Sequence, residues 1–225
     1  LFDEMDRRTI AKILRDHGWD ADEARGVWMI DPNGNVFVDM TKGAQYLHET
    51  KAYILSGFQR VTQEGPLAGE KVRGIKAVLV NVDLHEDPVH RGLAQIAPAT
   101  WRAVYASMLT AEPTLLEPIM RIDVKVPQDF MGAVTSIISS KRGKISNVVQ
   151  SEYVTTVIGE IPAAEAGDLA DQMRAATMGK AFWGMEFAAW RPVPASLFEK
   201  VVMEIRKRKG MPLKLPTVED YVEEA

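Results

Sequence analysis

Hydrophobic and polar positions follow two different periods along the first part of the chain. Residues 1–17 place apolar side chains at helical spacing, and Gly18 after them is a typical helix stop. The stretch GVWMIDPNGNVFVDM then predicts a β-hairpin around its DPNGN turn. Residues 41–61 return to the helical period, which predicts a helix with Thr41 as its N-cap.

A strand and a helix are predicted next, with a short connection between them. The stretch VRGIKAVLVNVDLH alternates as a strand does, and one face would carry Val78, Val80, Val82 and Leu84. The stretch PATWRAVYASMLTAEP predicts a helix with Pro98 in its first turn, where a missing N–H costs nothing. The connection DLHEDPVHRGLAQI therefore lies where side chains and backbone amides are displayed to a ligand.

From about Glu117 the pattern predicts a second α+β unit. The stretches MRIDVKV, KISNVVQ, YVTTVIGEI and AFWGMEFAAW read as strands, and PQDFMGAVTSIISSKRG and PAAEAGDLADQMRAATMG as helices. The resulting order βαββαβ is that of a ferredoxin-like fold, with two helices on one face of an antiparallel sheet. A basic-ended helix, SLFEKVVMEIRKRKGM, follows and would dock its apolar stripe on another surface.

Composition excludes several classes of protein. The 225 residues are 46% hydrophobic, enough to fill real cores, and the net charge of -4 gives no global positive field for nucleic acid. Cysteine is absent, which rules out disulfides and thiolate chemistry. No apolar run approaches the roughly 20 residues of a membrane span, so no membrane contact is expected.

Two of the four histidines, His85 and His90, lie in the connection with Asp87 and Pro88 between them. Zinc-protease histidines are four residues apart on one helical face, whereas these two are five apart. A helix or a strand would point them in different directions, and Pro88 disfavours a helix. A loop could still gather His85, Asp87 and His90, so a small hydrolase or metal enzyme remains the alternative interpretation.

Other motifs are weaker. Neither GxxxxGK[ST] nor a GxGxxG that opens a helix is present, so nucleotide binding by those loops is not expected. The basic cluster Lys141, Arg142 and Lys144 surrounds Gly143 and could meet RNA phosphates, although a short charge run is more often a solvated face.

The stretch LHEDPVHRGLAQI resembles the tip of domain IV in the elongation factor 2 family, GTPases of ribosomal translocation. GWDADEARGVWMIDPNG, DMTKGAQYLHETK, GFQRVTQEGPLAGEKVRG, YASMLTAEPTLLEPI, KRGKI, MGKAF and IRKRKGM resemble the same family in the same order. The resemblance implies an S5-like α+β domain IV over residues 1–116 with its tip loop at 84–96. It also implies a ferredoxin-like domain V over 117–193 and a C-terminal helical tail, 194–225, that packs back on domain IV.

In this family the histidine before Arg-Gly is converted to diphthamide and accepts ADP-ribose from bacterial toxins. The resemblance assigns that role to His90, and it assigns tip shaping and RNA contact to His85, Asp87, Arg91 and Gly92. Because the arginine side chain forms a bidentate fork, we expect Arg91 to face phosphate.

The resemblance also implies partners and the absence of an activity. The partners would be the ribosome, with its rRNA, tRNA and mRNA at the decoding centre, and the enzymes of diphthamide synthesis, all in the cytoplasm. GTP and Mg²⁺ belong to a domain that this sequence lacks, as it lacks the first part of domain IV. We therefore expect no catalytic residue, no cofactor and no metal in this chain. Leu93 and Ala94 replace glycines found in eukaryotic relatives, which should stiffen the loop.

Overall fold

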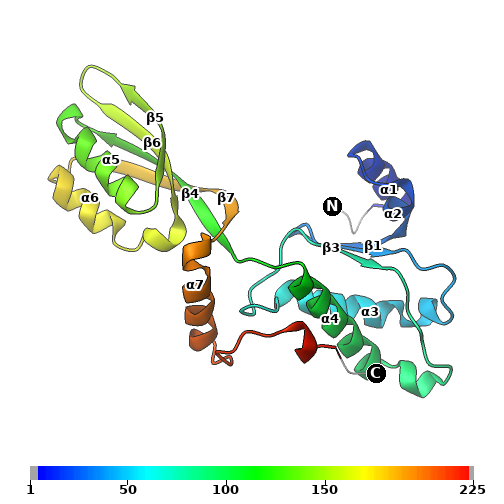
Figure 1. Cartoon of the computed structure of the whole chain (residues 1–225). Coiled ribbons are helices and arrows are strands. Elements are labelled where there is room, and N and C mark those ends of the chain that lie inside the picture. Colours follow the sequence, from blue (N-terminus) through cyan, green and yellow to red (C-terminus); the bar gives the residue numbers. More distant parts are fainter. Residues whose placement is uncertain (1–4, 223–225) are drawn as a thin grey trace. The chain divides into compact units, whose positions relative to one another are not determined.

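The structure of the chain is a computed structural model that describes residues 5–222, and it divides into two compact units. Unit 1 comprises residues up to Pro113 together with the segment from Lys200 onward, and unit 2 comprises Thr114–Glu199. Both units combine helices with a sheet, which confirms the predicted α+β class (Figure 1). Within residues 5–222, no helix has the length and apolarity needed to cross a bilayer.

Unit 1 is built from a small three-stranded sheet in the order β1-β2-β3, with β1 antiparallel and β3 parallel to β2. Helices α3 and α4 lie side by side against it (Figure 1). Its core packs Phe37 of the sheet against Ile54 and Phe58 of α3. The bounds of its elements are α1 Arg7–Asp16, α2 Ala21–Gly26, β1 Val27–Ile30, β2 Val36–Asp39, α3 Leu47–Gln63, β3 Lys76–Leu79, the 3-10 turn η1 Pro88–Arg91, α4 Leu93–Thr110 and the 3-10 turn η4 Val218–Asp220.

Three expectations for unit 1 were wrong in detail. The strand predicted to reach Leu84 ends at Leu79, because its partner β2 ends at Asp39 and, among residues 5–222, no strand pairs with the chain beyond Leu79. Helix α4 begins at Leu93, so Pro98 lies inside the helix rather than in its first turn. The predicted cap Thr41 instead donates its hydroxyl to Asp39 (2.7 Å), and α3 begins after Tyr46, whose backbone is left-handed (φ 59°).

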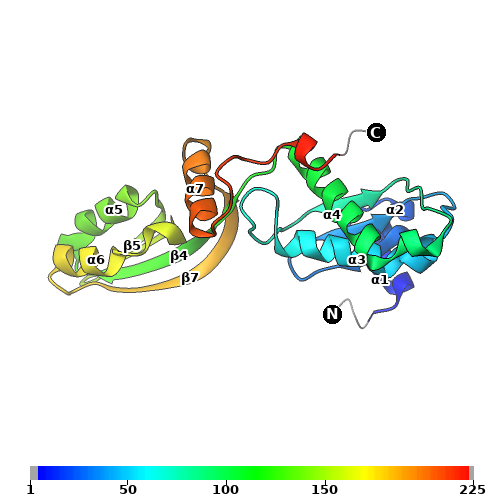
Figure 2. The same cartoon turned by 90° about the horizontal axis from the view of Figure 1, so that it is seen from below.

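Unit 2 has the predicted βαββαβ order. Its sheet runs β5-β6-β4-β7 with every pair antiparallel, and α5 and α6 lie on one side of it (Figure 2). Alternate residues of the central strands, such as Ile122 and Val124, are fully buried under Val134 and Ile138 of α5. The elements are β4 Leu116–Val126, η2 Gln128–Phe130, α5 Met131–Ser140, β5 Lys144–Gln150, β6 Thr155–Pro162, η3 Ala163–Glu165, α6 Leu169–Thr177 and β7 Phe182–Pro192.

The last helix, α7 (Ala195–Arg208), leads into a C-terminal segment that packs within unit 1. Arg206 of α7 is buried and donates to the carbonyl oxygens of Leu67 (2.6 Å) and Lys214 (3.0 Å). Further on, the ring of Tyr221 contacts those of Trp101 and Tyr105 on α4. The ring contacts of Tyr221 attach this segment to α4, the helix that follows the tip loop.

Candidate functional site

The connection that contains the tip loop leaves β3 at Leu79 and enters α4 at Leu93. Its final residues form the 3-10 turn η1, which the sequence did not predict, with Pro88 at the start of the turn where no N–H is needed. His85, Asp87 and His90 are exposed, whereas Arg91 is buried. Gly92 caps α4, and its carbonyl oxygen accepts the Ile96 amide (3.0 Å). A short, hydrogen-bonded turn therefore carries His90 into solvent.

Asp87 organises this turn through three hydrogen bonds. Its carboxylate accepts the Val89 amide (3.0 Å) and its carbonyl oxygen accepts the His90 amide (3.1 Å). Its own amide donates to Nδ1 of His85 (3.0 Å). Because that nitrogen is an acceptor, the proton of the neutral His85 ring is on Nε2.

The rings of His85 and His90 are in contact, with centroids 4.7 Å apart and planes at 67°. The spacing argument concerned a regular α-helix or strand, and the sequence left open that a loop could bring the two histidines together, as this loop does. Even so, among residues 5–222 no three His, Asp or Glu side chains form a group that could hold a metal ion. The metal-enzyme alternative therefore has no ligand set in the described part of the chain.

Arg91 does not face the solvent as the phosphate-binding side chain that we expected. It is only 6% exposed, and its Nη1 donates to the carbonyl oxygens of His85 (2.8 Å) and Glu86. Its Nη2 donates to Oε2 of Glu49 on α3 (2.9 Å), and the guanidinium stacks 3.8 Å from the ring centroid of Tyr46. No local pattern indicated these two partners, because Glu49 lies 42 positions from Arg91.

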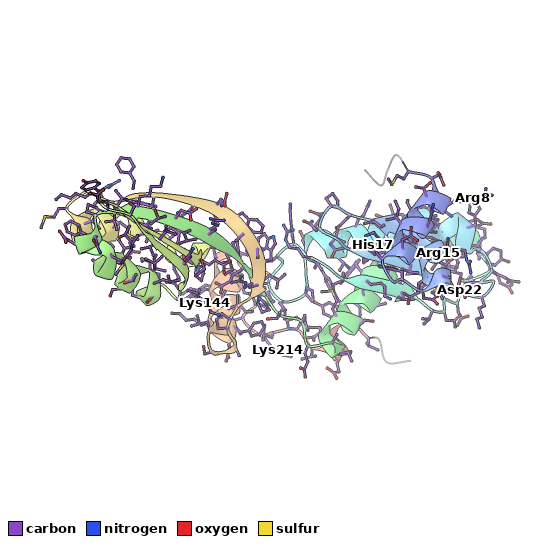
Figure 3. The ribbon with its side chains drawn as sticks, turned by 90° about the horizontal axis from the view of Figure 1, so that it is seen from above. Arg8, Arg15, His17, Asp22, Lys144 and Lys214 are labelled. Atoms are coloured by element: carbon purple, nitrogen blue, oxygen red, sulfur yellow. The ribbon has the colours of Figure 1, made fainter. Side chains whose placement is uncertain are left out.

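The basic cluster is also largely engaged within its own unit. The buried Lys141 pairs with Asp168, and Arg142 pairs bidentately with Glu117 (2.9 and 2.8 Å) and with Glu165 (2.8 Å). The hydrogen bonds that Arg142 donates to the Glu117 carboxylate are the main cause that raises the pKa of Arg142 above its ordinary value. Lys144, labelled in Figure 3, is exposed at the start of β5.

Comparison with known proteins gives matches over both units. Residues 2–112 match the family model of elongation factor G domain IV, and residues 114–201 match that of the elongation factor G C-terminus. Elongation factor 2 of Staphylothermus marinus is 52% identical over 221 residues, and that of Pyrobaculum islandicum is 50% identical over 223. Each alignment covers 98% of this chain but 30% of the relative's length.

Proposed function

The chain belongs to the elongation factor 2 and elongation factor G family, and from this we propose that it serves ribosomal translocation in protein synthesis. Unit 1 would act as domain IV, which presents its tip loop to tRNA and mRNA at the decoding centre. The single observation that carries this proposal is the exposed His90 on a hydrogen-bonded turn, in a chain with this family membership.

We further propose that His90 is the residue converted to diphthamide, and so the acceptor of ADP-ribose from toxins. Its ring is exposed, whereas its backbone is fixed by the bond from its amide to Asp87. A modifying enzyme can therefore reach the imidazole without unfolding the loop. The enzymes that build diphthamide would then be partners of this chain in the cytoplasm.

GTP hydrolysis would belong to regions of the full-length relatives outside the 30% of their length that this chain matches. We therefore propose no catalytic or cofactor role for this chain. Unit 2 would contribute a contact with ribosomal RNA through Lys144. Lys141 and Arg142 would support that contact indirectly, because their ion pairs fix the turn that precedes β5.

Mass spectrometry tests the modification of His90. The chain is produced in an archaeal host, where the family's modifying enzymes are present, and in bacteria, where they are absent. The peptide with residues 83–96 should carry the added mass only in the archaeal sample, and His90→Gln should abolish it. An unmodified peptide from the archaeal host would refute the assignment of His90.

Cross-linking tests the ribosomal contact. The chain has no cysteine, so a single cysteine at Val89, which is 73% exposed, places a photoreactive group uniquely at the tip. We expect cross-links to small-subunit RNA near the decoding centre from Val89→Cys. A cysteine at the exposed Lys12 on α1 is the matched control. Equal cross-linking from both positions would contradict a specific contact of the tip.

A further inference from the structure

The buried guanidinium of Arg91 joins residues 85 and 86 to Arg91 itself, and it joins both to α3, a helix distant in sequence. Its bonds to the carbonyl oxygens of His85 and Glu86 close the chain into a ring from residue 85 to residue 91. Its bond to the Glu49 carboxylate attaches that ring to α3. Three acceptors on two segments are satisfied by one planar group, which a lysine ammonium on a flexible stem does not match.

Tyr46 completes this clamp from an unusual backbone position. It precedes α3 with a left-handed conformation (φ 59°), which an L-residue with a large side chain rarely adopts. Its ring lies against the Arg91 guanidinium, with 3.8 Å between the Cζ atom and the ring centroid. A residue in this conformation persists when its surroundings determine it, and here the surroundings include the stacked guanidinium.

We propose that Arg91, held by Glu49 and Tyr46, is a positioning residue for His90. The clamp keeps residues 85–91 closed, so that the imidazole of His90 is presented in one orientation against the ring of His85. This inference deepens the proposed function, because that function supplies the partner which reads or modifies His90. The closure of the loop is a property of the chain itself and is measured independently of any partner.

Amide hydrogen exchange tests the closure. The amides of Val89 and His90, both bonded to Asp87, report on the turn. We expect them to exchange about tenfold faster in Arg91→Lys and in Glu49→Gln, since each change removes or weakens a charge-assisted hydrogen bond. The matched control is Arg60→Lys. The guanidinium of Arg60 stacks on Trp101 of α4 and not on the loop. Unchanged exchange in both clamp variants would overturn the proposal.

Kinetics of modification test the positioning. Hydrogen exchange gives the closed fraction of the loop in each protein, and with a purified archaeal enzyme that transfers the aminocarboxypropyl group from S-adenosylmethionine, Arg91→Lys should raise KM by the factor by which that closed fraction falls. Only the closed loop is competent to bind, so kcat should stay within about twofold. A fall in the closed fraction without a rise in KM would refute the positioning role and leave the proposed function intact. If the unaltered chain is not modified at all, the proposed function fails, and hydrogen exchange still decides whether Arg91 closes the loop. If Arg91→Lys does not fold, Glu49→Gln takes its place in both measurements, because it alters an exposed side chain.

Discussion

The imidazole rings of His85 and His90 lie 4.7 Å apart, edge to face, although Glu86, Asp87, Pro88 and Val89 separate them in sequence. Asp87 brings the two rings together, because its amide donates a hydrogen bond to Nδ1 of His85 and its carbonyl oxygen accepts one from the amide of His90. The two histidines therefore form one surface, and a partner that reaches His90 also meets His85.

A denaturation experiment should distinguish the exposed His90 from the buried Arg91 by the free energy of unfolding that each substitution costs. His90→Ala should change the free energy of unfolding by less than about 0.5 kcal/mol, because an exposed side chain contributes little burial. Arg91→Ala should cost about 1–3 kcal/mol, because it leaves the carbonyl oxygens of His85 and Glu86 without their donor. Urea denaturation of the purified variants measures both. An equal loss for both would show that His90 is structural.

The elements of unit 2 could be predicted from the sequence because each is marked by residues within the element itself. Alternation marks β4 and β6, and Gly143 ends the helix region where a Cβ would lie 2.5 Å from the Ile138 carbonyl oxygen. Unit 1 was harder because the extent of a strand depends on its partner, and the alternating residues after Leu79 have none in the described chain. The direction of Arg91 depends on Glu49 and Tyr46, which no local pattern connects to the tip.

The close approach of α3 and α4 should make Gly57 sensitive to substitution. A Cβ there would lie 2.5 Å from the Ala97 carbonyl oxygen and 2.7 Å from Cβ of Thr100. Gly57→Ala should therefore destabilise the chain by about 1–3 kcal/mol through overpacking. Gly132→Ala in α5 is the control, because a Cβ there meets nothing within 4 Å, and it should be neutral or stabilise by up to about 1 kcal/mol. Equal melting temperatures for the two variants would contradict the tight helix contact.

Tyr105 should make unit 1 sensitive to alkali. Burial, followed by the neighbouring Tyr221, raises the pKa of the Tyr105 phenol from 10.0 to about 12. A raised folded pKa gives stability that is complete below pH 10 and is lost as the pH rises towards 12. Fluorescence of Trp101, whose ring contacts Tyr105, follows unfolding as the pH is raised.

Tyr105→Phe should weaken this alkaline loss, at a cost near neutral pH of about 1 kcal/mol for the lost hydrogen bond to the Glu64 carbonyl oxygen. Tyr153→Phe, at an exposed tyrosine of unit 2, is the control and should leave the pH profile unchanged. A profile that is the same in all three proteins would show that Tyr105 does not govern the alkaline transition.

Acid should weaken unit 2 at the ion pair of Lys141 and Asp168. The hydrogen bond from Lys141 is the largest of the causes that lower the pKa of the Asp168 carboxyl below its ordinary value of 3.8. A lowered folded pKa gives stability that is present above 3.8 and is lost as the pH falls through the folded value. Lys141 is buried, so protonation of Asp168 leaves an ammonium group without its anionic partner.

Asp168→Asn should consequently be less stable than the unaltered chain at pH 6 and should approach it in stability near pH 2, since the variant has no carboxylate to protonate. Denaturation followed by the fluorescence of Trp183, which packs against the core of unit 2, measures the difference at each pH. Asp129→Asn, at an exposed position of the same unit, is the matched control and should keep the slope of the unaltered chain. A difference in unfolding free energy between Asp168→Asn and the unaltered chain that stays constant from pH 6 to pH 2 would mean that this ion pair does not produce the acid sensitivity. The stability of unit 2 would then rest on its apolar core and on the carboxylates that bind Arg142.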